Sequence, residues 1–122
     1  MGARNFRDYS VWKEAVDLAT HIYQITSEMP WFEKKGLCDQ MQRSAVSISS
    51  NIAEGAGRIS DGEFAHFLSI ALGSAFETET QLLISKNVGY ISEEQYCDIR
   101  TKLASIEKQL NGLILTIRCS SN

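Results

Sequence analysis

Glu63 and His66 have the spacing of residues that bind metal in helical bundles. Three positions apart, a carboxylate and an imidazole lie on one face of a helix, and di-iron sites combine two Glu-x-x-His pairs with two further glutamates. The 122-residue chain contains this spacing only once. Glu63 is more simply explained as an acid in the first turn of a helix, and His66 as a surface or interface side chain. We therefore expect no metal site and no other cofactor.

The glycines of the segment GAGRIS, Gly55 and Gly57, invite comparison with phosphate-binding loops. The dinucleotide fingerprint requires a third glycine where this chain has Ser60, and it requires a preceding strand. No strand pattern precedes the segment, and no lysine follows it at the P-loop position. A junction between two helices explains the glycines better, because glycine commonly ends a helix.

Nucleophilic catalysis has no convincing candidate in the sequence. The serines include no Gly-x-Ser-x-Gly turn, and His21 has no serine or cysteine at a telling spacing. Cys38, Cys97 and Cys119 are far apart and odd in number, which indicates free thiols. Because no Cys-x-x-Cys pair is present, a zinc knuckle is excluded. The residue types therefore predict a protein that is not an enzyme.

The composition is typical of a soluble globular protein, with 43% hydrophobic and 22% charged residues. No apolar run reaches the roughly 18 residues of a membrane-spanning helix. The start, MGARNFRDYS, lacks the apolar core of a signal peptide. We expect a single domain over residues 1–122, located in the cytoplasm and without membrane contact.

The net charge of −3 is unevenly distributed. Residues 1–58 hold seven basic and seven acidic side chains, residues 59–94 hold one against six, and residues 95–122 hold four against two. Nucleic-acid-binding domains are usually strongly basic, so the overall charge argues against that role but leaves room for a local basic patch.

Two segments of the first half have apolar residues at intervals of three and four, as amphipathic helices do. The first is predicted to begin with Ser10 as its cap and to end at Pro30, and the second covers residues 35–57. Their apolar positions are Val11, Ala15, Leu18, Ile22, Ile25 and Met29, then Leu37, Met41, Ala45, Ile48 and Ile52.

Two longer helices are predicted in the second half. One begins at Ser60 or Asp61 and ends near Gly89, which suits a left-handed cap, and the other begins with a capping box from Ser92 to Gln95. Four helices with short connections favour an all-α, antiparallel, up-down-up-down four-helix bundle. The predicted core positions here are Phe64, Leu68, Ala71, Ala75 and Leu82, then Tyr96, Ile99, Leu103, Ile106, Leu110, Leu113 and Ile117.

The first and third helices carry more apolar residues than one core can bury. A helix that is apolar on more than one face requires a second partner, and copies of the same chain are its commonest source. We therefore expect a homo-oligomer; the alternative is a monomer with a broad core and some exposed apolar side chains. The additional apolar residues are Trp12, Val16, Tyr23, Phe67, Ile70, Leu72, Phe76 and Leu83.

Polar residues form a second stripe on each of the two middle helices. If the stripes face each other, they would form a hydrogen-bonded layer between helices or between subunits. The alternative is that both are solvated faces. Gly73 would allow close helix approach in the layered arrangement. The stripes comprise Arg43, Ser47, Asn51, Glu54 and Arg58 on one helix, and Ser74, Glu77 and Gln81 on the other.

The segments SISSNIAEGAGR and FAHFLSIALGSAFETETQL together resemble the bacterial 23S rRNA-intervening sequence proteins. FRDYSVWKEAVDLATHIYQIT, MPWFEKKGLCDQMQRSAVSI and NVGYIS are similar to the same family, so the resemblance covers nearly the whole chain. The resemblance implies a left-handed four-helix bundle that assembles into a ring-shaped homopentamer. The family's motif positions, which include the polar stripes together with Gly55, Gly57 and Gly73, look like packing and interface residues rather than catalytic ones.

A related branch of this family, the accessory variability determinants of diversity-generating retroelements, uses a basic pentameric barrel to bind RNA and a reverse transcriptase. The acidic middle of this chain departs from that branch and weakens the electrostatic contribution to RNA affinity. Oligomerisation could still gather basic residues into repeated patches. The candidate RNA contacts are one group of Arg4, Arg7 and Lys13, or a second group of Arg100, Lys102, Lys108 and Arg118.

Two functional hypotheses follow from the sequence and the resemblance. The first is a non-enzymatic homo-oligomeric scaffold, pentameric by resemblance, whose partner is RNA or a ribonucleoprotein. The second is a protein-binding or structural assembly module without a nucleic-acid role.

Overall fold

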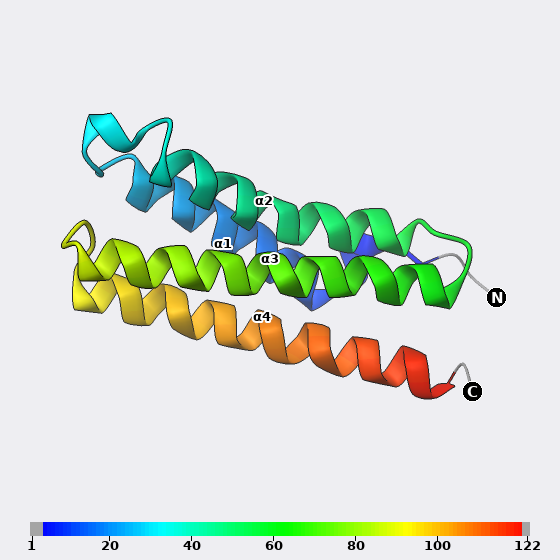
Figure 1. Cartoon of the computed structure of the whole chain (residues 1–122). Helices are drawn as coiled ribbons and strands as arrows, with labels where there is room; N and C mark the ends of the chain where they lie inside the picture. The colour runs from blue at the N-terminus through cyan, green and yellow to red at the C-terminus, as the bar shows by residue number, and fades with distance from the viewer. Residues whose placement is uncertain (1–3, 121–122) are drawn as a thin grey trace.

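The computed structural model describes residues 4–120, which form a bundle of four α-helices (Figure 1). Successive helices run in opposite directions, and no strand occurs in residues 4–120. The predicted all-α, up-down-up-down bundle is therefore confirmed. The helices are α1 (Ser10–Thr26), α2 (Leu37–Ala56), α3 (Asp61–Asn87) and α4 (Glu93–Ser120), with short 3-10 turns η1 (Phe6–Asp8) and η2 (Trp31–Glu33).

Each helix packs against the two helices that neighbour it in the bundle. The α2–α3 and α3–α4 contacts are the most extensive, whereas α1 and α4 touch least. The backbones of helices on opposite corners of the bundle stay apart, with no pair of Cα atoms within 8 Å. No helix within residues 4–120 combines the length and apolar character needed to cross a lipid bilayer.

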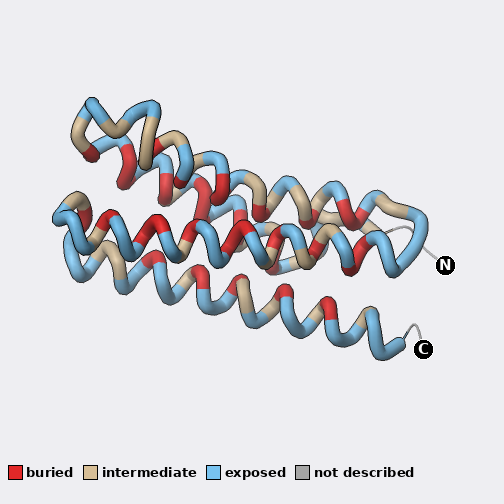
Figure 2. Tube along the Cα trace, in the orientation of Figure 1, coloured by how far each residue is buried: buried red, intermediate tan, exposed pale blue. Residues whose placement is uncertain are grey.

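The bundle core is continuous along the length of the molecule (Figure 2). The predicted apolar stripes supply nearly all of it, and their members on α1 and α3 are completely or almost completely buried. Toward the end of α4 the buried position is Ile114, while Leu113 and Ile117 are only partly buried. An α-helix has 3.6 residues per turn, so a strict seven-residue repeat drifts around it.

Three of the predicted helix boundaries are confirmed, two by hydrogen bonds and one by its backbone conformation. The Ser60 hydroxyl accepts a hydrogen bond from the Glu63 backbone N–H at 3.1 Å and caps α3. Ser92 and Gln95 form a reciprocal capping box at the start of α4, with bonds of 2.9 and 3.1 Å. Gly89 has a φ of +84°, the left-handed conformation that glycine adopts without strain.

Two predicted boundaries of α1 are wrong. Tyr9 rather than Ser10 is the N-terminal cap residue, and the Ser10 hydroxyl instead donates to Gln109 of α4 at 2.8 Å. The helix ends at Thr26, before Pro30, because the Glu28 and Met29 backbone N–H groups bond to carbonyls only three residues back. Those shorter bonds tighten the last turn and end the α-helix before proline is reached.

Candidate interaction surfaces

A buried hydrogen-bonded layer joins α2 to α3. The Ser44 hydroxyl donates to Oε1 of Gln81 at 2.8 Å and accepts from the Thr78 hydroxyl at 2.8 Å. All three side chains are buried. A polar network inside an apolar core fixes the register of two helices, because any slip leaves a polar group without its partner.

A second contact extends this layer toward the surface. The Ser47 and Ser74 hydroxyls lie 2.8 Å apart across the two helices. The Asn51 side-chain N–H groups donate to the backbone oxygen and hydroxyl of Ser47, within the same helix. Asn51 therefore supports the layer from α2 rather than reaching α3.

The charged residues of the two predicted stripes lie outside the layer. Arg43 pairs with Asp39 at 3.0 Å, and Arg58 pairs with Glu54 at 2.5 Å, both along α2 or its end. Glu77 is exposed on α3. These charged side chains remain near water, where their ion pairs contribute little to stability.

The sequence stripes also omitted Ser44 and Thr78, which occupy the centre of the layer. Each lies three positions from a predicted stripe member, Ser47 and Gln81 respectively. That helical spacing was the available signal, since residues three apart share a helix face.

Replacing Thr78 by valine is expected to lower the free energy of unfolding by about 1 to 2 kcal/mol. The change keeps the side-chain volume but removes the hydroxyl that donates to Ser44. Thr101→Val is a matched control, because Thr101 is exposed on α4 and its hydroxyl donates to the Cys97 carbonyl at 2.8 Å. Urea unfolding followed by circular dichroism compares the two, and equal losses would contradict a role for the layer.

At the α2–α3 junction, Arg4 binds residues of both sides and Gly55 allows the two helices to pack closely. The Arg4 guanidinium donates to the Arg58 carbonyl at 2.6 Å, pairs with Asp61 and lies 4.7 Å from the Phe64 ring centroid. Gly55 is buried, and a Cβ atom placed there would lie 2.6 Å from Cβ of Phe67. Gly55 thus allows α2 to pack closely against Phe67 of α3.

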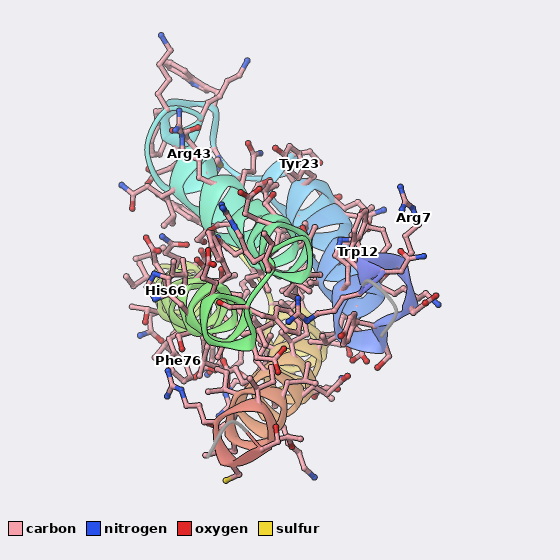
Figure 3. All side chains as sticks on the ribbon, turned by 90° about the vertical axis from the view of Figure 1, so that its right-hand side faces the viewer. Arg7, Trp12, Tyr23, Arg43, His66 and Phe76 are labelled. Atoms are coloured by element: carbon pink, nitrogen blue, oxygen red, sulfur yellow. The ribbon has the colours of Figure 1, made fainter. Side chains whose placement is uncertain are left out.

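The outward side of α3 is rich in large apolar side chains. Phe76 is 53% exposed, and Ile70, Leu83 and Ile84 are each at least 40% exposed. In Figure 3, Phe76 and His66 project from α3 on the side away from Trp12 and Arg7 of the N-terminal region. We call Ile70, Gly73, Phe76, Leu83 and Ile84 the outer α3 face.

Gly73 lies in this outer α3 face, so it does not provide a close helix contact within the subunit, and close approach between subunits stays a prediction. A Cβ atom at Gly73 would meet nothing within 4 Å. Glycine in the middle of a helix costs about 1 kcal/mol relative to alanine. No atom of residues 4–120 lies close enough to Gly73 to require a glycine there.

The additional apolar residues of α1, Trp12, Val16 and Tyr23, are covered in part within the subunit. The Trp12 ring packs edge-on against Phe6 of η1, with centroids 4.9 Å apart. Val16 and Tyr23 remain exposed. The turn η1 thus covers one end of this track, which leaves the outer α3 face as the more continuous apolar surface.

A groove of 560 Å³ separates α3 from α4 beside this face. Its apolar wall is made by Leu72, Phe76 and Ala104, and two carboxyl groups, Glu79 and Glu107, line it from the two helices. Burial, together with a hydrogen bond to Glu79 and its negative charge, raises the pKa of Glu107 to about 7, although Arg100 opposes the shift. Glu107 therefore exchanges its proton near neutral pH.

Two of the predicted RNA contacts, Lys102 and Arg4, are paired with acidic residues inside the subunit. Lys102 pairs with Asp17 at 3.0 Å and lies 3.2 Å from Nδ1 of His21, so it joins α4 to α1. Arg4 is committed to the α2–α3 junction. The remaining residues are exposed but dispersed: Arg7 beside Phe6, Lys13 on α1, Arg100 and Lys108 along the groove, and Arg118 bonded to Ser69 at 3.3 Å.

The Glu63–His66 pair is not joined by further ligands. Glu63 interacts with Ser60 at the start of α3, and the His66 ring contacts Phe67 with centroids 5.9 Å apart. Within residues 4–120, no group of three or more histidine, cysteine, aspartate or glutamate side chains is arranged to hold a metal ion.

An exposed aromatic pair in the α1–α2 connection was not predicted from the sequence. Trp31 is 87% exposed, and its ring meets Phe32 edge-on at 6.2 Å. The turn η2 is anchored because the Tyr90 hydroxyl donates to Glu33 at 2.8 Å. The turn interrupts the helical periodicity, so the stripe pattern gave no indication of where these rings would lie.

Comparison with known proteins agrees with the geometry of the bundle. A family model described as 23S rRNA-intervening sequence protein matches residues 7–112. No curated protein matches the chain. A crystal structure of a protein of unknown function from the S23 ribosomal protein family of Bacteroides thetaiotaomicron is 32% identical, with a TM-score of 0.78 over 85% of this chain and 97% of that one. This chain belongs to the 23S rRNA-intervening sequence protein family.

Proposed function

We propose that this protein is a non-enzymatic scaffold that assembles with copies of itself through the outer α3 face. The observation that carries the proposal is the exposure of Ile70, Phe76, Leu83 and Ile84 around Gly73 on one side of α3. Large exposed apolar patches mark interaction sites in soluble proteins. A helix of another copy can approach closely at a glycine, which accounts for a residue that weakens the isolated helix.

The proposed assembly is a closed ring, and the family resemblance suggests five subunits. A single face on α3 must then contact a different surface on the next subunit, because ring interfaces other than two-fold dimers are heterologous. The exposed Val16 and Tyr23 of α1 supply an apolar surface on another side of the subunit. A two-surface arrangement of this kind is compatible with a ring.

Light scattering tests the assembly directly. We expect a mass that is an integral multiple of the 13.6 kDa subunit at micromolar concentration. A single species at the subunit mass throughout the accessible concentration range would overturn the proposal.

RNA is the second part of the proposal, with the ring as its platform. Arg7 and Lys13 are exposed near the start of each subunit, and neither has an ion pair within residues 4–120. Repetition around a ring would multiply these cations, and neutralised phosphates release counterions. The alternative is a protein-binding module. Its best candidate contact is the exposed Trp31, which lies in the anchored turn η2.

Titration with structured RNA at two salt concentrations separates the two alternatives. We expect binding tighter than about 10⁻⁴ M at low salt, weakening steeply as salt is raised. The double variant Arg7→Gln, Lys13→Gln should reduce the salt dependence, whereas Lys102→Gln should not, since Lys102 is already paired with Asp17. Binding weaker than this limit at low salt would exclude the RNA role and leave the protein-binding module.

A further inference from the structure

The carboxyl pair in the α3–α4 groove lies next to the proposed assembly surface. Phe76 belongs both to the outer α3 face and to the wall of the groove that contains Glu79 and Glu107. A copy that packs onto the outer α3 face would therefore also cover the groove. Coverage of the groove therefore depends on the proposed self-assembly.

One oxygen of the pair is already withdrawn from water in the single subunit. Oε2 of Glu107 is buried and receives no N–H or hydroxyl donor from residues 4–120. A buried acceptor without a donor is costly, so burial of this oxygen favours the protonated form of Glu107. Two carboxylates so close together cannot both remain charged without strong repulsion.

We propose that covering the α3–α4 groove drives proton uptake by the Glu79–Glu107 pair, so that self-assembly is linked to pH. Packing another copy against the groove removes water from both carboxyl groups, and burial favours the neutral form of an acid. The protonated subunit therefore assembles more tightly than the deprotonated one. By linkage, assembly must weaken as pH rises above the titration of the pair in the free subunit.

The direction of the effect follows from the charges around the pair. Glu79 approaches from α3, while Arg100 and Lys108 line the same groove from α4. Arg100 partly offsets the carboxylate charge but forms no ion pair with Glu107 among the described residues. The pKa of Glu107 is about 7 in the free subunit, so the proton is bound at pH 6 and lost by pH 8.5.

Sedimentation velocity at fixed ionic strength from pH 6 to pH 8.5 tests this linkage. We expect the dissociation constant for each contact to rise by about thirtyfold over this range, the effect of one proton per contact with a pKa of about 7 in the free subunit. In Glu107→Gln, which is neutral at every pH, the dissociation constant should stay constant and low. An unchanged pH dependence in Glu107→Gln would overturn the inference.

Two matched variants separate this pair from other titratable groups on α3. Glu77→Gln removes an exposed acid outside the groove, and His66→Gln removes the histidine that projects from α3. Both should keep the pH dependence of the unmodified protein. Loss of the pH dependence in Glu77→Gln or in His66→Gln would also overturn the inference.

The same experiment distinguishes the inference from the assembly proposal. Assembly that is equally tight at all pH values would refute proton linkage and leave the assembly proposal standing. A protein that stays at the subunit mass at every pH would refute both.

Discussion

Gly55→Ala is expected to lower the free energy of unfolding by about 2 to 3 kcal/mol, a large loss for a single added methyl group. Its Cβ atom would lie 2.6 Å from Cβ of Phe67 and 3.3 Å from the Phe64 carbonyl oxygen. Neither atom is the free end of a flexible side chain, so α2 and α3 must separate. Separation also stretches the hydrogen bonds of the Ser44 layer, and we expect a lower midpoint in urea unfolding followed by circular dichroism.

Gly57→Ala is the matched control, two residues away in the same motif. A Cβ atom there would lie 3.5 Å from its nearest neighbour, and the backbone φ of −81° suits any residue. The substitution should stabilise the protein by about 0.4 to 1 kcal/mol, because alanine has less conformational freedom than glycine in the unfolded chain. Equal effects of the two substitutions would show that close helix approach is not the reason for Gly55.

Gly73→Arg is expected to weaken self-assembly by about a hundredfold or more while the subunit remains folded. The side chain meets nothing within 4 Å in the subunit, so it enters water without a clash. Within the proposed contact, the long side chain would hold the two copies apart, and burial would remove water from its charge. Light scattering across a concentration series measures the change in assembly, and circular dichroism confirms that the helices are retained.

Gly112→Arg controls for the general effect of adding a charged residue to a helix. Gly112 also has nothing within 4 Å, but it lies on α4 beside Gln109 and Leu113, toward α1. Both substitutions should stabilise the isolated helix by roughly 0.5 to 1 kcal/mol. If Gly112→Arg disrupts assembly as strongly as Gly73→Arg, the outer α3 face is not the surface through which copies of the chain assemble.

The local features of this fold could be predicted from the sequence because their causes are local. The spacing of Ile99, Leu103, Ile106 and Leu110 allows them to share one face of a helix, and all four are buried. The caps at Ser60 and Ser92 and the left-handed Gly89 depend on residues within one turn. Such signals do not require knowledge of any distant segment.

The polar stripes predicted the contact between α2 and α3 only in part, because local spacing carries no information about a distant helix. Helical spacing indicates which residues share a face, but it does not define how far that face is rotated toward its neighbour. Ser47 and Ser74 meet across the two helices, whereas Arg43 and Glu77 of the same stripes remain exposed. The rotation depends on the packing of Gly55 against Phe67, which involves two separate helices.

By itself, the sequence determined that the chain forms four amphipathic helices with an excess of apolar residues on the third. Only the tertiary structure decided that Gly73 faces outward, that Arg4 is held at the α2–α3 junction, and that Glu79 and Glu107 meet in one groove. Each of these facts depends on how helices are turned and placed relative to one another. Helix formation is fixed by neighbours a few residues away, but the relative placement of helices is fixed by side-chain packing between distant segments.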